Sequence, residues 1–306
     1  MFARSVFSGL LLWFPFTLIA ALLCSHPTAA APACIDGRDF SAMTFNTWGL
    51  PEPWLEDPAR FTDIAQSLPS LQSDVVAFQE AFTSEAQVLT RMPDYPFVAH
   101  GPAATGPVQL SSGLLLVSKW PILRKEEWVF SACSSADCLA NKGIMYVQLE
   151  VPGIGRMDVF NTHLNSADYG EIKSLQIDEV RDFVRYYSGP RPAIVLGDFN
   201  LTDDTTNYRK FVNETGLRDT YREFVAGHPE LSLVDRLGLT IDRVRNEIAQ
   251  RVDSYSSRID YIWGSSEDRM DLCVRSAQLL FQAPVRGRHL SDHFAMQAHL
   301  RVSGIR

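Results

Sequence analysis

The stretch IVLGDFN, residues 194–200, is the part of the sequence that most strongly indicates the fold and its chemistry. Its apolar start predicts a buried strand that ends at Gly197, where the missing side chain lets a ligand approach the backbone closely. Asp198 and Asn200 are two positions apart, so their side chains point to the same side of an extended chain. A carboxylate there can order a water molecule, and an amide can donate to a phosphate oxygen. An Asx-rich turn is the alternative, and we favour a functional site.

Other predicted strands also end in polar residues that can bind ligands. We expect strands over residues 41–46, 74–78, 113–118, 144–149, 157–162, 193–196, 258–263 and 294–302. These strands place at or near their ends Asn46, Glu80, His163, Asp260 and the pair Asp292-His293. Amphipathic patterns predict helices over residues 58–71 and 171–187, and residues 221–256 are expected to form a mostly helical, polar excursion. The alternation predicts two sheets with helices outside them.

The N-terminal region differs from the rest of the chain. Arg4 precedes an apolar run from Val6 to Leu23, and small residues follow up to Ala33. This layout predicts a secretory signal peptide over residues 1–33 and a single domain over residues 34–306. The apolar run is also long enough for an uncleaved anchor. We expect a secreted protein, with the periplasm as the alternative location.

Charge and cysteine content restrict the partners and the compartment. A net charge of −8 argues against a basic face that would grip nucleic-acid phosphates. Four of the five cysteines lie after the predicted leader: Cys34, Cys133, Cys138 and Cys273. An even number in an exported protein suggests disulfides. The short spacing favours a local Cys133–Cys138 bridge and leaves Cys34–Cys273 as the second pair, while free buried thiols are the alternative.

The residues at the strand ends suit a hard cation and proton transfer. Glu80 and Asn46 offer oxygen ligands of the kind that Mg²⁺ prefers, and Mg²⁺ needs only one or two carboxylates because it keeps several waters. His293 can move protons near neutral pH, and a buried Asp260 needs a partner. A hydrogen-bonded Asp260–His293 pair would orient the imidazole, and an ion pair between Asp260 and Arg258 or another arginine is the alternative.

Six ordered blocks resemble the endonuclease/exonuclease/phosphatase superfamily. They are residues 45–46, 78–80, 161–163, 197–200, 258–261 and 291–293, which together span nearly the whole chain after the leader. The resemblance implies an α/β fold, a deoxyribonuclease-like four-layer sandwich of two mixed β-sheets flanked by helices. It also implies the cleavage of phosphate esters.

The same resemblance implies a role for each residue of the blocks. Glu80 and Asn46 would hold Mg²⁺ beside Asp292, with Mn²⁺ or Co²⁺ as alternative ions. Asp198 would position the water, Asn200 would bind the scissile phosphate, and His163 would stabilise the transition state. His293, oriented by Asp260, would be the general base, and Asp198 is the alternative proton acceptor.

Three further stretches resemble the neutral sphingomyelinases and bacterial sphingomyelinase C. They are residues 46–51, 112–122 and 133–143. In the third, Asp137 precedes Asn-Lys-Gly at residues 141–143, which is similar to a loop that is thought to contact the substrate in that family. Lys142 can offer a point charge to a phosphate and is expected to bind substrate, while an ordinary exposed loop lysine is the alternative.

Two features depart from that family. Residues 221–256 look helical and polar, where secreted bacterial sphingomyelinases often carry an aromatic hairpin that inserts into the membrane. Trp54, Trp120 or Trp128 could contact a membrane instead, because aromatic rings favour the interface. In addition, His163 is followed by Leu-Asn and not by the Thr-Gln expected of the nearest relatives.

We therefore predict a secreted, Mg²⁺-dependent phosphodiesterase that acts as a monomer on a phospholipid at a membrane surface, giving ceramide and phosphocholine from sphingomyelin. Nucleic acid is not an expected partner. A secreted nuclease and an inositol-phosphate or lipid phosphatase of the same fold remain alternatives. A catalytically dead binding module is a further alternative that fits poorly, because every block residue is present.

Overall fold

A computed structural model describes residues 37–51, 57–106, 108–166, 170–189, 191–265 and 272–302. The predicted signal peptide, Cys34 and Trp54 lie outside these residues. Within the described ranges, none of the helices has the length and apolar character that crossing a bilayer requires.

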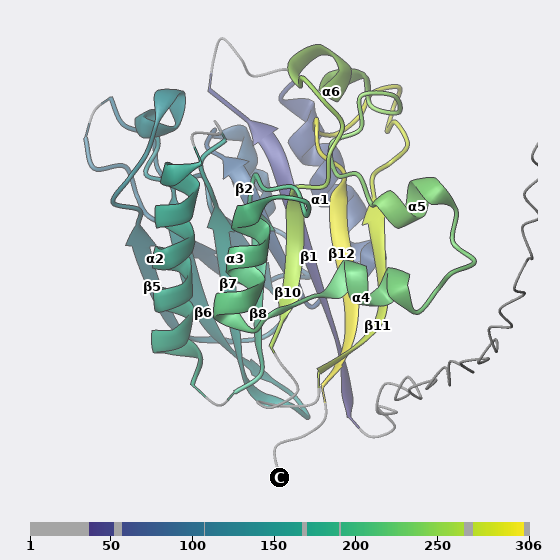
Figure 1. Cartoon of the computed structure of the whole chain (residues 1–306). Helices are drawn as coiled ribbons and strands as arrows, with labels where there is room; N and C mark the ends of the chain where they lie inside the picture. Colours follow the sequence, from purple (N-terminus) through teal and green to yellow (C-terminus); the bar gives the residue numbers. More distant parts are fainter. Residues whose placement is uncertain are drawn as a thin grey trace, which may run out of the picture. The chain divides into compact units, whose positions relative to one another are not determined.

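Two six-stranded sheets form the centre of the fold (Figure 1). The first has the order β11-β12-β1-β2-β4-β3, and these strands span Leu272–Leu280, Ala295–Val302, Arg38–Gly49, Val75–Ala81, Leu115–Ser118 and Phe97–His100. The second has the order β5-β6-β7-β8-β10-β9, and these strands span Ile122–Val129, Gly143–Val151, Gly155–His163, Ala193–Asp198, Asp260–Gly264 and Arg218–Asp219. Both sheets are mixed, because β1–β2 and β7–β8 are parallel and the other pairs are antiparallel.

Helices cover the outer faces of the two sheets. The α-helices α1 to α6 span Ala59–Leu71, Glu171–Ser188, Thr206–Thr215, Thr220–Ala226, Leu233–Leu237 and Glu247–Val252, and the 3₁₀ helices η1 and η2 span Glu85–Thr90 and Ser135–Leu139. Helix α1 packs on the outer face of the first sheet, and α2 and α3 pack on that of the second (Figure 1). The predicted four-layer α/β sandwich is confirmed.

Apolar side chains on both faces of the central strands explain the layers. Along β8, Ile194 and Leu196 enter the core between the sheets, while Ala193 and Val195 enter the core beneath α2 and α3. Successive side chains of a strand point to opposite faces, so a continuous apolar run is what a strand buried on both sides requires. The local Cys133–Cys138 bridge is also confirmed. Cys273 is disulfide-bonded too, but its predicted partner lies outside the described residues.

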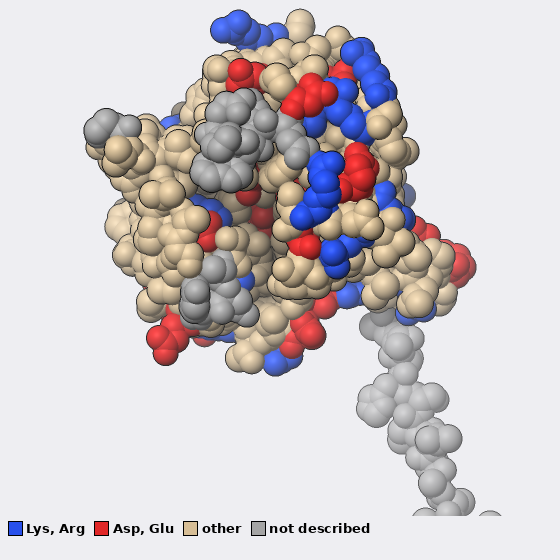
Figure 2. Space-filling model, turned by 90° about the horizontal axis from the view of Figure 1, so that it is seen from above, with Lys and Arg blue, Asp and Glu red and all other residues tan. Residues whose placement is uncertain are grey.

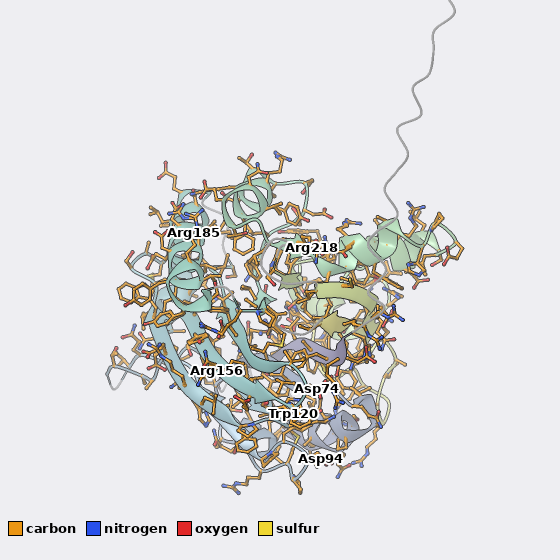
Figure 3. The ribbon with its side chains drawn as sticks, turned by 90° about the horizontal axis from the view of Figure 1, so that it is seen from below. Asp74, Asp94, Trp120, Arg156, Arg185 and Arg218 are labelled. Carbon is orange, nitrogen blue, oxygen red and sulfur yellow. A yellow bond between two sulfur atoms is a disulfide. The ribbon has the colours of Figure 1, made fainter. Side chains whose placement is uncertain are left out.

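The predicted polar excursion is less helical than expected. Residues 221–256 contain α4, α5 and α6, which are short helices separated by turns. Gly227 and Gly238 cap two of these helices, and Pro229 follows the first of them, which explains why no long helix forms. Trp120 lies at the opposite end of the sheets from the strand ends that carry Glu80 and Asp198 (Figure 3). Its indole N–H donates to Asp74 at 3.1 Å.

Candidate active site

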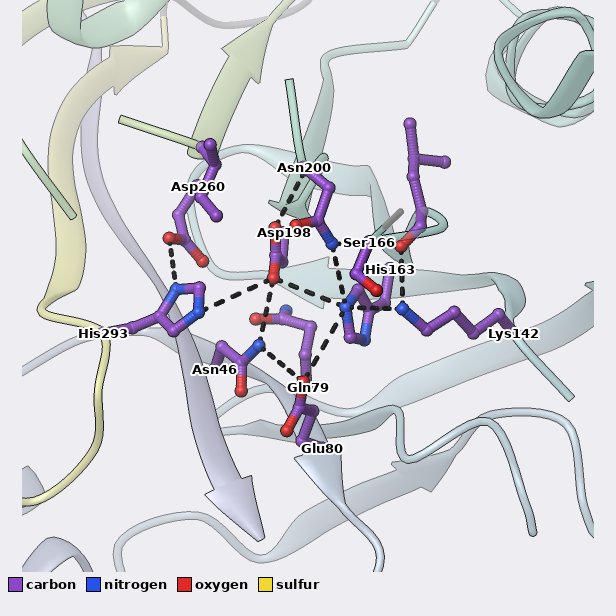
Figure 4. Close-up of polar contacts among 12 residues, drawn as sticks. Asn46, Gln79, Glu80, Lys142, His163, Ser166, Asp198, Asn200, Asp260 and His293 are labelled. Carbon is purple, nitrogen blue, oxygen red and sulfur yellow. Dashed lines mark hydrogen bonds and ion pairs between the residues drawn. The ribbon is translucent and has the colours of Figure 1, made fainter. Parts of the chain in front are cut away.

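The strand ends that carry the predicted residues meet at one place between the two sheets (Figure 4). Asn46 and Glu80 come from the parallel strands β1 and β2, and His163 and Asp198 end the parallel strands β7 and β8. Carboxyl ends of parallel strands lie at the same edge of a sheet, which is why residues far apart in sequence gather there. Asp260 begins the antiparallel strand β10 and pairs in register with Asp198.

Asp198 is the centre of the polar network. Its side chain is 2% exposed. Its Oδ1 accepts the backbone N–H of Asn200 at 2.9 Å, and its Oδ2 accepts the amide Nδ2 of Asn46 at 3.0 Å. The Nε2 atoms of His163 and His293 lie 3.4 Å and 3.9 Å from the same Oδ2. A carboxylate flanked in this way by two imidazoles and two amides can hold a water molecule in a fixed position.

Asp260 and His293 form the predicted pair. His293 Nδ1 lies 2.7 Å from Oδ2 of Asp260, and both residues are buried. Burial opposes charge on the imidazole, but the carboxylates of Asp260 and Asp292 outweigh it and raise the pKa of His293 well above its ordinary value. The alternative partner is excluded, because Arg258 binds Asp219 and Asp203 instead. The pair leaves His293 Nε2 directed towards Asp198 (Figure 4).

The acidic side chains fit a divalent cation. Among the described residues, no hydrogen-bond partner reaches the buried Oε2 of Glu80. Burial, together with the negative charge of the nearby Asp292, raises the pKa of Glu80 to about 7. Asp292 is itself buried, and its pKa is raised chiefly by burial. A buried, unpartnered carboxylate beside a second one is a costly arrangement that bound Mg²⁺ would relieve.

The side-chain amide of Asn46 donates hydrogen bonds to the carboxylates of Glu80 and Asp198. Nδ2 donates to Oε1 of Glu80 at 3.1 Å as well as to Asp198, and Oδ1 accepts the backbone N–H of Trp48 at 3.0 Å. The amide nitrogen therefore screens the two carboxylates from each other. The assignment of Asn46 as an oxygen ligand for a metal stays a prediction, and it requires the side chain to rotate.

A second group of atoms also has the spacing of metal ligands. Ligand atoms of Asp198, Asp260 and His293 all lie within 4.8 Å of one another. We regard this group as the proton-transfer part of the site, since the hydrogen bond between Asp260 and His293 already occupies the ligand atoms that face each other. The unpartnered oxygen of Glu80 favours the cation position on the other side of Asp198.

Hydrogen-bond donors face the opposite side of the site. His163 Nε2 lies 3.0 Å from Lys142 Nζ and 3.3 Å from Asn200 Nδ2, and both of these groups also donate to the carbonyl of Leu164. Burial and the charge of Lys142 lower the pKa of His163 to about 3, so the imidazole is neutral and accepts. A cation and an amide N–H group thus stand together, and a phosphate oxygen that replaces one of these contacts could be bound there.

Lys142 is not the exposed loop lysine of the alternative interpretation. It is 6% exposed and forms an ion pair with Asp137 at 2.6 Å. The other oxygen of Asp137 accepts the backbone N–H and the hydroxyl of Ser166. Asp137 lies inside the loop that the Cys133–Cys138 disulfide closes.

Backbone strain is located at the same strand ends. Trp48, Glu80 and Asn200 have φ values of 48°, 56° and 49°. This region suits Gly and is tolerated by Asn, but it is unfavourable for Trp and Glu. Non-glycine residues held there are frequent at ligand sites, so these three agree with a functional site at this edge, and five other described residues elsewhere share the same backbone region.

The sequence did not reveal two charged residues near the site. Asp253 follows α6, and burial together with Asp292 raises its pKa to about 6. Its Oδ2 is buried without a partner among the described residues. Arg60 lies within α1, where it is 1% exposed and donates to the carbonyls of Thr47 and Trp48 at the end of β1. Neither residue stands in a motif, and each acts through its position in the fold.

A cavity of about 700 Å³ opens beside Asn200. Its walls come from the start of α2, the loop after β8, the start of α3 and Tyr255. Seen from above, Asp and Glu side chains lie inside a hollow on this face, and Lys and Arg side chains gather beside it (Figure 2). The cavity therefore gives a ligand access to Asn200 from this face.

Comparison with known proteins relates this site to phosphodiesterases. A profile described as "Endonuclease/Exonuclease/phosphatase family" matches residues 43–293. A sphingomyelinase of Mycobacterium bovis is 29% identical over 194 residues, which are 60% of this chain and 39% of that protein. A phospholipase C of Staphylococcus aureus is 29% identical over 238 residues, which are 69% of this chain and 70% of that protein. The matched part spans less than half the length of the mycobacterial relative.

Solved structures share the fold. Beta toxin from Staphylococcus aureus has a TM-score of 0.68 at 22% identity, covering 85% of this chain and 99% of that chain. A variant of beta toxin with bound magnesium ions has a TM-score of 0.64 at 20% identity, covering 86% and 99%. TDP2 of D. rerio, complexed with single strand DNA product, has a TM-score of 0.67 at 17% identity, covering 86% and 99%. At these identities the likeness establishes the fold and leaves the substrate open.

Proposed function

Because the chain belongs to the endonuclease/exonuclease/phosphatase family, we propose that it is a secreted, Mg²⁺-dependent phosphodiesterase that cleaves sphingomyelin to ceramide and phosphocholine. The observation that carries the proposal is the group of polar side chains at the strand ends. The carboxylates of Glu80 and Asp292 lie on one side of Asp198, and the donors Lys142 and Asn200 lie on the other. Relatives named sphingomyelinase support the lipid substrate.

The residues of the site divide the work of an in-line displacement. Lys142 and the amide of Asn200 would bind the non-bridging phosphate oxygens, held in place by the neutral Nε2 of His163. Asp198 would orient the attacking water, whose proton passes to the Asp198–His293 pair. The water oxygen would bond to phosphorus as the bond to the ceramide oxygen breaks. The leaving oxygen would take a proton from solvent water, and the Asp198–His293 pair would release to solvent the proton that it accepted.

Glu80, Asp292 and Asn46 would hold the Mg²⁺. A bound divalent cation supplies positive charge that stabilises the leaving alkoxide and the phosphate. The unpartnered Glu80 oxygen and the raised pKa values of Glu80 and Asp292 support this donor set.

Exposed apolar side chains around the site suit a lipid surface. Tyr255 is 65% exposed and, together with Leu175, lines the cavity that reaches Asn200. Val244 is 90% exposed, and Val252 next to Asp253 is also exposed. Isolated apolar residues on a surface are ordinary, but Tyr255 and Leu175 line the cavity through which a bilayer phosphodiester would reach Asn200. Trp120 lies at the opposite end and gives no such contact (Figure 3).

Hydrolysis assays with purified protein test the proposal. Sphingomyelin vesicles, phosphatidylcholine vesicles and plasmid DNA are each incubated with Mg²⁺ and with EDTA. We expect Mg²⁺-dependent release of phosphocholine from sphingomyelin and no nicking of DNA. Nicking of the plasmid without lipid cleavage would show that the substrate is nucleic acid and that the protein is a nuclease. Undiminished activity of Glu80→Gln or His293→Ala would contradict the assigned roles.

A further inference from the structure

The last part of the polar excursion lies along the loop that carries Asp292 and His293. We call residues 240–257 the brace. Its contacts follow the loop in order: Thr240 with Phe294, Ile241 with His293, Asn246 with Ser291 and Asp292, and Glu247 with His289. The proposed reaction assigns these brace residues no part, although four consecutive contacts of this kind hold one short loop.

Asn246 makes the most specific of these contacts. It is 1% exposed, and its Nδ2 donates to the carbonyls of Ser291 and Asp292 at 2.8 Å and 3.1 Å. Its Oδ1 caps α6 by accepting the backbone N–H groups of Ile248 and Ala249. One side chain therefore fixes the start of a helix and the backbone immediately before His293.

Thr240 holds the other member of the catalytic pair. It is fully buried, and its hydroxyl accepts the backbone N–H groups of Ile259 and Asp260 at 3.1 Å and 3.3 Å. Its carbonyl accepts the N–H of Phe294 at 2.7 Å. The same residue thus touches the backbone of Asp260 and the backbone directly after His293.

These bonds matter because the two partners come from different sheets. Asp260 begins β10 of the second sheet, and His293 precedes β12 of the first. Their hydrogen bond of 2.7 Å therefore depends on how the two sheets are held at this edge. We propose that Thr240 and Asn246 are positioning residues that set the geometry of the Asp260–His293 pair, an inference that rests on the proposed phosphodiesterase function.

The test uses isosteric variants of the full chain. Asn246→Asp keeps an acceptor for the helix cap but removes the two donors, and Thr240→Val removes the hydroxyl at constant shape. Thr240→Ser restores the hydroxyl. Ser232→Ala is the matched control, because Ser232 caps α5 and, within the described part of the chain, makes no hydrogen bond to residues 289–294.

The first readout is steady-state hydrolysis of a soluble chromogenic phosphodiester and of sphingomyelin vesicles. We expect kcat of Asn246→Asp and Thr240→Val to fall roughly ten- to a hundredfold at nearly constant KM, since misplacing a reacting group by about 1 Å costs up to about a hundredfold. Thr240→Ser is expected to recover most of the loss, and Ser232→Ala to match the wild type.

The second readout does not depend on activity. The Nδ1 proton of His293 is followed by NMR and assigned by its absence in His293→Ala. We expect this signal to move or broaden in Asn246→Asp and Thr240→Val, while the spectrum elsewhere is retained. Unchanged kcat in both variants, or an unchanged imidazole signal, would overturn the inference. If the wild type hydrolyses neither substrate, the proposed function fails, and the imidazole signal still decides the positioning role.

Discussion

Replacing Glu80 by Gln should make the protein more stable in the absence of Mg²⁺ while abolishing its activity. Glu80 is 17% exposed, and one of its oxygens has no partner among the described residues. Gln keeps an acceptor for the amide of Asn46 and removes a buried negative charge. The change therefore tests two effects of the Glu80 carboxylate separately: its cost to the stability of the fold and its contribution to metal binding.

The size of the effect follows from the pKa of Glu80. Burial and Asp292 raise this pKa from 4.5 to about 7. Each tenfold change in the dissociation constant is worth about 1.4 kcal/mol, so the ionised group destabilises the fold by on the order of 3 kcal/mol. Below pH 4.5 the carboxyl is protonated in both the folded and the unfolded protein, and the cost vanishes. It grows as the pH rises from 4.5 and is complete above about 7.

Urea unfolding at pH 4.5 and at pH 8, with EDTA or with Mg²⁺, measures each part of this reasoning. In EDTA at pH 8 we expect Glu80→Gln to be more stable than the wild type by about 3 kcal/mol as an upper value, and at pH 4.5 the difference should nearly disappear. Mg²⁺ at a hundred times its dissociation constant should stabilise the wild type by about 2.7 kcal/mol and the variant by much less. Glu150→Gln on the exposed face of β6 is the control.

Two results would refute this account. If Glu80→Gln is less stable than the wild type in EDTA at pH 8, Glu80 is not an uncompensated buried charge. If both proteins gain equally from Mg²⁺, the cation binds without Glu80 and the proposed donor set is wrong. Activity alone could not separate these cases, because the variant is expected to be inactive in both.

Three further changes test other parts of the site. Asp260→Asn should lower kcat by about a thousandfold or more in steady-state kinetics, as loss of the carboxylate does in hydrolase triads. Calorimetry should show a melting temperature within a few degrees of the wild type. Gly197→Ala would place a Cβ 2.0 Å from the carbonyl oxygen of Thr162, and thermal unfolding should show a loss of stability of about 3 kcal/mol or more. Gly106→Ala is the control, because its Cβ would meet no atom within 4 Å and the change should be neutral. Tyr255→Ser should weaken sedimentation with sphingomyelin vesicles by about tenfold, the value expected for losing one interfacial aromatic ring, while hydrolysis of a soluble diester is unchanged.

The central strands could be predicted because both of their faces are buried. Strand β8 begins as a continuous apolar run, β7 contains the apolar pair Val159-Phe160, and the ends of both are marked where polar residues take over. Strands β5 and β11 were not predicted. Both lie at sheet edges, and β5 carries charged residues at most of its middle positions. Helix α3 was missed for a similar reason, since Phe211 is its one fully buried residue. Edge elements need only one partner surface, so their sequences carry a weak pattern.

The candidate site could be predicted to the extent that it stands at strand ends. Asp198 and His293 follow or precede apolar runs, so their positions were visible in the sequence. Thr240, Asn246 and Asp253 were not, because the excursion that contains them has no regular apolar period and its contacts depend on how it folds back along residues 289–294. The direction of the Asn46 amide was equally hidden, since it depends on two carboxylates from other strands.

Several unfavourable features of the structure lie where the reaction is proposed to occur. Glu80 combines a left-handed backbone with a buried, unpartnered oxygen, and Asn200 and Trp48 share the backbone strain. Each such feature costs on the order of 1–3 kcal/mol, and none would persist unless the two sheets around it were well packed. The fully buried strand β8 and the buried residues Val75 to Gln79 of β2 provide that packing. Substitutions that relieve the strain at Glu80 should therefore stabilise the fold and reduce activity together, whereas substitutions in the brace should reduce activity by displacing His293, with no gain in stability.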